Sequence, residues 1–188
     1  MLYGYGFWLP SLFQRSHGLT LTTTSQLVAA IVFVGGVSGN LLGGWLADRW
    51  GARWKGAYAY IPSVGALVAL PLTTLGLFTD NLWLAAPLLL APQACALLAT
   101  SPIGAALQHL GPANMRATTV ALYMFIFNLT GLGIGTMLLG SVSDLFTARF
   151  GDEALRYALL CVGLVLYPVS SLLYFLAGRN LRRDWYNG

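Results

Sequence analysis

The chain has 188 residues, of which 57% are hydrophobic and only 9% are charged, with a mean hydropathy of +0.69 and a formal net charge of +4. A soluble domain carries about 25% charged residues, so this composition excludes an ordinary soluble protein and places the chain in a lipid bilayer. The basic residues are spread among predicted helix ends and form no stripe with interleaved aromatic residues, which excludes a nucleic-acid partner.

Residues 2–13 are apolar, but they are too short to span a bilayer alone because the polar run QRSH follows at 14–17. We expect them to be the outer part of a longer helix whose start is missing. A secretory signal is the alternative, yet this segment has neither a basic leading region nor a small-residue cleavage site.

Five further stretches are long and apolar enough to cross the hydrocarbon layer, which takes about 20 residues per helix. None contains a charged residue. Backbone polar groups cannot stay unpaired in lipid, so stretches of 21 to 26 residues must be helices rather than barrel strands. The sequence therefore predicts an all-α, polytopic membrane bundle in one unit over 1–188. The predicted spans are 25–47, 57–78, 82–107, 117–140 and 157–177.

Basic residues are retained on the cytoplasmic side of a membrane, so their distribution predicts the orientation. If the segment after the first full span is cytoplasmic, seven basic residues lie inside and three, Arg15, Arg149 and Arg156, lie outside. The C-terminus is then cytoplasmic, and we expect a plasma membrane, such as a bacterial inner membrane. The seven inside residues are Arg49, Arg53, Lys55, Arg116, Arg179, Arg182 and Arg183.

Small residues repeat every four positions in the span 25–47. Gly35, Gly39 and Gly43 form one row, and a second row holds Gly36, Asn40 and Gly44. Faces without bulk let another helix approach closely, so we expect helix packing here. Chance recurrence in a chain with 22 glycines is the alternative.

Four charged residues crowd positions 48–55. We expect Asp48 to close the helix, Gly51 to supply the backbone for a tight reversal, and Arg53 and Lys55 to lie at the headgroup level. A surface ion pair between Asp48 and Arg53 is an alternative role for the carboxylate.

A polar stripe runs along the span 82–107. A polar stripe in lipid costs free energy unless it faces protein or water, so we assign this face to a substrate cavity. Three prolines, Pro87, Pro92 and Pro102, predict that this span is bent. At 100° per residue the stripe comprises Gln93, Leu97, Thr100, Gly104 and Gln108.

Other polar candidates for the cavity come from two more segments. Asn128 lies midway along 117–140, where its amide either contacts substrate or bonds a neighbouring helix. Tyr3, Tyr5 and Trp8 of the partial helix either line the cavity or belong to an interfacial aromatic belt.

No enzyme or cofactor pattern accompanies these features. Cys95 and Cys161 lie within spans, and His17 and His109 fall on opposite membrane faces, so no metal site is predicted. There is no G-x-S-x-G, and GLGIG at 131–135 lacks the third glycine of a dinucleotide fingerprint, so neither a hydrolase nor a nucleotide cofactor is predicted.

One short motif resembles a known family. The residues around the charged turn match the pattern G-x-L-A-D-R-x-G-x-R of the major facilitator superfamily, which follows the second and eighth helices of its members. This resemblance implies that the motif is a conformational switch, with Asp48 favouring a helix N-terminus of the other lobe when the inner gate is closed. The matching residues are Gly44, Leu46, Ala47, Asp48, Arg49, Gly51 and Arg53.

The resemblance extends to the C-terminal half of that family. Residues 111–144 resemble the eleventh helix with its G-x-x-S-D exit, and EALRYALL and AGRNLRRDW resemble the last loop and tail. The span 82–107 lacks the arginine common in the fourth helix of the N-terminal half. The resemblance implies a six-helix half with a truncated first helix, and a missing N-terminal half as partner.

Within the family, FWLPSLFQRSHGLT at 7–20 and GLGIG look most like the spinster-type branch, although Thr136 stands where that branch usually has proline. This implies a secondary transporter of small organic or amphipathic, lipid-like solutes working by alternating access. The alternative is a non-transporting membrane protein that assembles with a separate half. No Asp, Glu, Lys, Arg or His lies in a predicted span, so these spans offer no embedded proton carrier.

Overall fold

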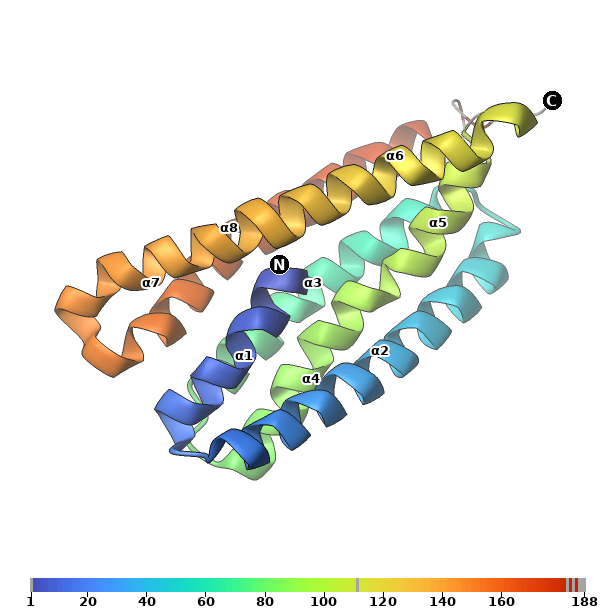
Figure 1. Ribbon diagram of the computed structural model, residues 1–188. Coiled ribbons are helices and arrows are strands. Elements are labelled where there is room, and N and C mark those ends of the chain that lie inside the picture. Colours follow the sequence, from blue (N-terminus) through green and yellow to red (C-terminus); the bar gives the residue numbers. More distant parts are fainter. Residues whose placement is uncertain (1, 111, 182, 184, 186–188) are drawn as a thin grey trace.

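The computed structural model describes residues 2–110, 112–181, 183 and 185, which fold into a bundle of long helices (Figure 1). Two 3₁₀ turns, η1 (Ala113–Met115) and η3 (Gly151–Glu153), and a π-helical segment, η2 (Leu129–Gly135), complete the chain. The α-helices are α1 (Leu2–His17), α2 (Leu21–Gly51), α3 (Ala57–Leu77), α4 (Leu82–Leu98), α5 (Thr100–Gln108), α6 (Arg116–Asn128), α7 (Thr136–Phe150) and α8 (Ala154–Asn180).

The helices have the length and composition of membrane spans. Four helical stretches qualify: residues 21–51, 57–77, 82–108 and 116–180. The last stretch turns back at η3, so it contains two crossings (Figure 1). The predicted class, an all-α polytopic membrane protein, is confirmed.

Three predicted spans end three or more residues inside the helices that contain them, and one of these is 157–177, which lies within α8. α2 begins four residues before the predicted span 25–47 and ends four residues after it. Helical structure also continues from Arg116 through η2 to Phe150, ten residues beyond the predicted end at 140. Charged and polar residues end the apolar run but not the helix, because the backbone hydrogen bonds of a helix are internal to it.

The predicted bend in the span 82–107 is present at Ala99. α4 ends at Leu98 and α5 begins at Thr100. Pro102 has no backbone N–H, so it cannot bond the carbonyl of Leu98 four residues earlier, and the helix breaks there. Pro87 and Pro92 lie inside α4 without interrupting it.

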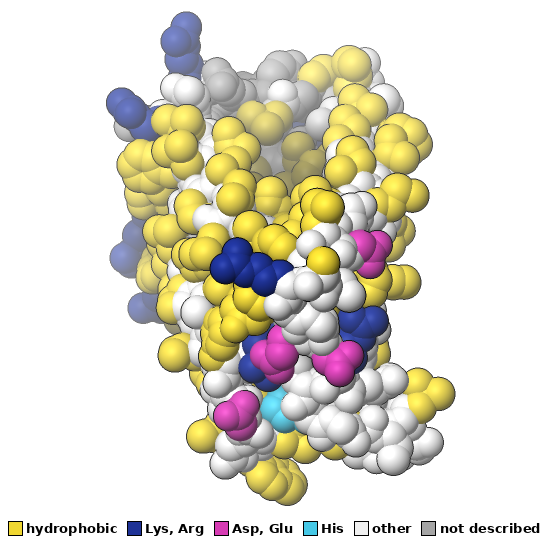
Figure 2. All heavy atoms as spheres, turned by 90° about the vertical axis from the view of Figure 1, so that its left-hand side faces the viewer, with side chains coloured by type: hydrophobic (Ala, Val, Ile, Leu, Met, Phe, Trp, Pro, Cys, Tyr) yellow, Lys and Arg dark blue, Asp and Glu magenta, His cyan; other side chains and the backbone are white. Residues whose placement is uncertain are grey.

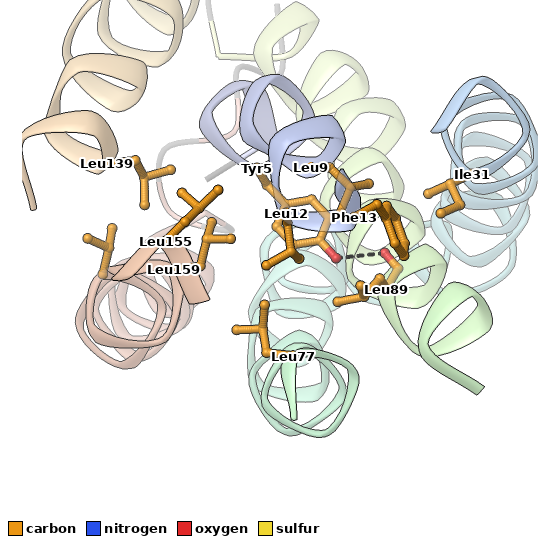
Figure 3. Packing of buried hydrophobic residues seen from close by; sticks show 11 residues of the cluster. Tyr5, Leu9, Leu12, Phe13, Ile31, Leu77, Leu89, Leu139, Leu155 and Leu159 are labelled. Atoms are coloured by element: carbon orange, nitrogen blue, oxygen red, sulfur yellow. Dashed lines mark hydrogen bonds between the residues drawn. The ribbon is translucent and has the colours of Figure 1, made fainter. Parts of the chain in front are cut away.

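The short helix α1 forms the centre of the hydrophobic core. Leu9, Leu12 and Phe13 on α1 are almost completely buried. Figure 3 shows how they point between the surrounding helices, against Leu77, Leu89 and the leucines of α7 and α8. α1 is therefore anchored through one buried face to α2, α4, α7 and α8.

Charges separate between the two ends of the bundle. One end carries the α2–α3 turn, the α5–α6 connection and the end of α8, and we call it the basic end. The opposite end carries Arg15, Arg149 and Arg156 together with Asp80, Asp152 and Glu153, and Figure 2 shows acidic side chains gathered there between apolar flanks. The described basic-end residues are Arg49, Arg53, Lys55, Arg116, Arg179 and Arg183; Arg182 lies outside the described residues.

A buried arginine ties helices together at the opposite end. Arg156 is 8% exposed, pairs with Glu153 at 2.8 Å and lies over the ring of Phe78. Partial burial and then the charge of Arg156 lower the pKa of His17, while Asp80 acts in the other direction. This cluster joins the end of α1 to the α3–α4 turn and the start of α8.

Candidate solute-binding site

A partly open cavity of about 160 Å³ lies between α3, the α4–α5 bend, α6 and α8, with Leu2 of α1 also in its lining, and we call it the internal cavity. Small side chains create it. On α3, Pro62, Gly65, Ala66 and Ala69 follow a helical spacing and line one wall. On the opposite wall the tyrosines and Ser170 of α6 and α8 face them. The cavity is apolar along α3 and hydroxyl-bearing along α8.

The polar groups of the cavity are held in place by their neighbours. Tyr167, which is 6% exposed, shares a hydrogen bond of 3.2 Å with Thr73. Tyr123, Tyr174 and Thr100 add hydroxyl groups, with Thr100 at the start of α5. The arrangement suits a small molecule with an apolar body and a few polar groups.

Of the residues predicted to line a cavity, Thr100 does so. Gln93 does not, because it is 5% exposed and its Cγ lies against Gly35 of α2. Its Oε1 has no hydrogen-bond partner among the described residues. The polar stripe of residues 93, 97 and 100 faces α2, so assigning the whole stripe to a cavity was wrong. Glycines on α2 leave room for these side chains, which explains why the stripe packs against protein.

Tyr5 is also misassigned by the sequence reasoning. Its ring is 2% exposed in the core and its hydroxyl donates to the carbonyl oxygen of Leu89 at 2.9 Å (Figure 3). Neither the cavity nor an aromatic belt contains it. Tyr5 anchors α1 to α4.

We expect Tyr5→Ala to destabilise the folded chain by about 3 kcal/mol, because it leaves a large void in a packed core. Tyr5→Phe keeps the ring and loses one hydrogen bond, which costs about 1 kcal/mol. Unfolding of the purified chain by dodecyl sulfate in mixed micelles measures both. Equal losses for the two variants would contradict the anchoring role.

Tyr3 and Asn128 meet at the contact between α1 and α6. The Tyr3 hydroxyl donates to Asn128 Oδ1 at 2.7 Å, and Asn128 Nδ2 donates to the Met124 carbonyl. Both side chains are half-buried. Beside them, Trp8 donates to the carbonyl of Thr136 at 3.1 Å. Asn128 therefore bonds a neighbouring helix, the second of the two roles considered for it.

The glycine rows of α2 lie against α4 and α5. Gly35, Gly39 and Gly43 are buried, and a Cβ at the last two would overlap the backbone carbonyls of Ala94 and Leu98. This is the close approach expected from the four-residue spacing.

The second row, which contains Asn40, is looser and polar. Thr100 Oγ1 donates to Asn40 Oδ1, and Ser101 donates to the Asn40 carbonyl at 3.2 Å. Asn40 itself is exposed. An exposed amide in the middle of a span requires protein or water opposite it.

The segment 48–55, which holds the four charged residues, differs from the prediction in two ways. Asp48 does not close α2, which continues to Gly51 with ordinary helical backbone. Gly51 is required for space instead, because a Cβ there would overlap the ring of Tyr58. Asp48 and Arg53 are exposed, and the ion pair considered between them is absent from the described part of the chain, where Arg156 and Glu153 form a pair.

The sequence did not predict an aromatic cluster at the basic end. Trp185 stacks on His109 at 4.5 Å and on Tyr58 at 5.5 Å between ring centroids, and Lys55 Nζ lies 4.8 Å from the Trp185 ring centre. The residues come from three separate segments of the chain, so no local sequence pattern predicts the cluster. The cavity wall on α3, by contrast, has a readable signal in its proline, glycine and alanines at helical spacing.

The described residues form a bundle of helical membrane spans. The bundle has a close contact of α2 glycines with α4, which we call the α2–α4 seam, together with a bent helix and an amphipathic internal cavity. This is the architecture of a multi-pass membrane transport protein. A family model for the Major Facilitator Superfamily matches residues 1–136. The chain belongs to this superfamily.

Known relatives agree with this family. An MFS-type efflux pump of Mycolicibacterium smegmatis is 30% identical over 175 residues, which cover 93% of this chain and 41% of the pump. The chain thus spans less than half the length of this curated relative.

Two solved structures share the fold. Both are of a bacterial homolog to the human lysosomal transporter Spinster, in inward-facing unoccupied and occupied conformations. The unoccupied form has a TM-score of 0.82 at 22% identity, covering 99% of this chain and 46% of that one. The occupied form has a TM-score of 0.78 at 23% identity, with 99% and 48% covered.

Proposed function

We propose that this chain is the C-terminal lobe of a secondary transporter that moves small organic or amphipathic solutes by alternating access. The second lobe of six helices is its partner, and the bilayer is its solvent. The observation that carries the proposal is the amphipathic cavity of about 160 Å³ between α3, α5, α6 and α8. The identity to an efflux pump supports solute export as the direction.

The polar contacts of α2 with α5 and of α1 with α6 indicate where the second lobe packs. Asn40 with Thr100, and Tyr3 with Asn128, are incompletely buried in this lobe. Polar groups at membrane depth are tolerated where they face protein or a water-filled passage. The face formed by α1, α2, α5 and α6 therefore meets the other lobe and the solute path, and Thr100 touches both this face and the cavity.

The basic end is cytoplasmic in this proposal. Six described basic residues lie there against three at the opposite end, where Asp80, Asp152 and Glu153 offset them. That asymmetry follows the positive-inside rule for a plasma membrane. In this proposal Asp48 and the C-terminal segment are cytoplasmic.

Asp48 is the switch residue in this arrangement. Its carboxylate is exposed at the end of α2 and is available to a helix N-terminus of the second lobe. Gly44, Arg49, Gly51 and Arg53 complete the motif around it. Contact in one state and its loss in the other biases the two conformations by the free energy of that contact.

Solute flux through the full-length gene product that contains this sequence, reconstituted in vesicles, tests the function. The panel contains a lysophospholipid, a sugar and an amphipathic cation, each measured with and without a proton gradient. We expect flux of at least one amphipathic solute, and a several-fold lower affinity for that solute in Thr100→Ala because the hydroxyl at the cavity is lost.

Gln93→Leu is the matched control on the same stripe. It removes an amide whose Oε1 has no hydrogen-bond partner among the described residues and which lies outside the cavity lining, so solute affinity is expected to stay unchanged. Absence of flux for every compound in a folded, reconstituted protein would favour the non-transporting alternative. If Gln93→Leu lowers solute affinity and Thr100→Ala does not, the solute site lies at the contact between α2 and α4 and not at the cavity.

A further inference from the structure

A second hollow opens on the outer surface between α2 and α3, and Gly65 and Cys95 line both it and the internal cavity. We call it the α2–α3 groove. It has a volume of about 520 Å³, its walls include Leu42 and Leu46 of α2 and Val64 and Val68 of α3, and its floor is Leu98 of α4. The groove exists because α2 and α3 both pack closely on α4 but touch each other little outside their turn.

The walls of the groove are apolar and face outward. Leu42 is 49% exposed and Val64 is 59% exposed. From Leu42 to Trp50 the groove runs about 12 Å along α2 at 1.5 Å per residue. The hydrocarbon of one leaflet is about 15 Å deep, half of the 30 Å core. The groove therefore has the length of a lipid chain within a single leaflet.

The end of the groove toward the α2–α3 turn changes from apolar to aromatic and basic. Trp50 and Trp54 line it and are about half exposed. Indole rings favour the headgroup level of a bilayer. This transition marks the boundary between the hydrocarbon and the lipid headgroups.

Basic side chains stand at the same end. Arg49 follows Leu42 by seven positions and Leu46 by three, so it continues their row on α2. Arg49 and Arg53 are exposed, and Asp48 beside them is exposed as well, while Lys55 is turned to the ring of Trp185 outside the groove. The Arg49 guanidinium lies 5.6 Å from the ring centre of Trp45. The mouth of the groove thus has a net charge of about +1 beside an apolar slot, which is complementary to an anionic headgroup with an acyl chain.

We propose that the α2–α3 groove binds one anionic phospholipid of the leaflet at the basic end, with an acyl chain against Leu98 and its phosphate near Arg49 and Arg53. The chain would contact the residue directly before the α4–α5 bend. The lipid thereby supports the bent form of that helix. This proposal does not depend on whether the protein transports solutes.

Tryptophan quenching by brominated lipids tests the proposal in a background in which Trp8, Trp45, Trp83 and Trp185 are replaced by phenylalanine, so that only Trp50 and Trp54, which line the groove, report. The purified chain is placed in nanodiscs of phosphatidylcholine with either brominated phosphatidylglycerol or brominated phosphatidylcholine at equal mole fraction. We expect the apparent affinity for the brominated anionic lipid to be about tenfold higher than for the zwitterionic one.

Two variants separate the parts of the site. Arg49→Gln with Arg53→Gln should reduce the preference to less than threefold while leaving quenching by bound chains intact. Val64→Phe fills the slot and should abolish saturable quenching. Leu67→Phe, on an exposed face of α3 outside the groove, is its matched control and should behave as wild type. Near-ultraviolet circular dichroism verifies that each variant is folded.

Equal quenching by the two lipids in the wild-type chain would overturn the proposal, since it would indicate ordinary annular lipid. Identical behaviour of folded Val64→Phe and Leu67→Phe would overturn the location. Quenching measures lipid contact and not solute flux. The lipid site can therefore be confirmed or rejected even if the transport proposal fails.

Discussion

Gly43→Ala is expected to destabilise the folded bundle by about 1–3 kcal/mol, the range for an added methyl in a packed interior. A Cβ at Gly43 would overlap the carbonyl oxygen and carbon of Leu98, which are backbone atoms and cannot rotate away. Gly39→Ala is expected to act alike, because the backbone of Ala94 lies in the same position one turn earlier. Either change forces α2 and α4 apart.

The adjacent glycine row provides matched controls on the same helix. A Cβ at Gly44 would lie 4.0 Å from Ser101, and one at Gly36 would lie 3.4 Å from the end of the Leu97 side chain. Both distances are ordinary contacts, and alanine is the better helix former by up to about 1 kcal/mol. Gly44→Ala and Gly36→Ala should therefore be neutral or slightly stabilising.

The midpoint of unfolding by dodecyl sulfate in mixed micelles, followed by circular dichroism, measures all four variants. A shared shift for Gly43→Ala and Gly44→Ala would show that the loss comes from glycine flexibility rather than from the α2–α4 seam. Opposite shifts would establish that the seam, and not the glycine content, holds these helices together.

Ala66→Phe is expected to reduce solute flux at least tenfold if the internal cavity is the solute site. Ala66 lies on α3 and lines the cavity, so a phenyl ring there occupies space within the 160 Å³ that a solute needs. A tenfold loss corresponds to about 1.4 kcal/mol of binding free energy. This prediction rests on the proposed transport function.

Leu67→Phe is the control that places the same phenyl ring one position along α3, outside the cavity. Leu67 is 52% exposed and lies outside the cavity lining. Its flux should match the wild type. Flux is measured in vesicles reconstituted with the full-length gene product, and melting temperatures identify any misfolded variant. Unchanged flux in folded Ala66→Phe would exclude the cavity as the solute site.

The bend of the α4–α5 helix was predictable because its cause is local. Pro102 lacks the N–H that the Leu98 carbonyl needs, and the sequence shows this. Pro87 and Pro92 lack the same group without interrupting α4, so the sequence predicted a bend in this span but not its position. The close-packed row of Gly35, Gly39 and Gly43 was equally readable, since a four-residue spacing of glycines leaves a smooth helix face whatever the partner is.

The substrate face was not predictable in the same way. Gln93 and Thr100 lie on one helical face, yet only Thr100 lines the cavity, while Gln93 packs under Gly35. Helical spacing tells which side chains share a direction but not which helix stands opposite. The prediction for Tyr5 was wrong for the same reason, because its hydroxyl bonds the Leu89 carbonyl, which is 84 positions away in the sequence.

The sequence by itself determined that the chain lies in a lipid bilayer, that it is helical and that it carries the family motif. The length of apolar stretches, the internal hydrogen bonding of a helix and a contiguous signature are all local properties. Only the tertiary structure decided which helix faces became a seam, a cavity, a lipid-facing groove or an aromatic cluster. Each of these requires residues far apart in the chain to meet, and in a bilayer, where apolar faces gain little by avoiding lipid, the fit between particular side chains selects the partners.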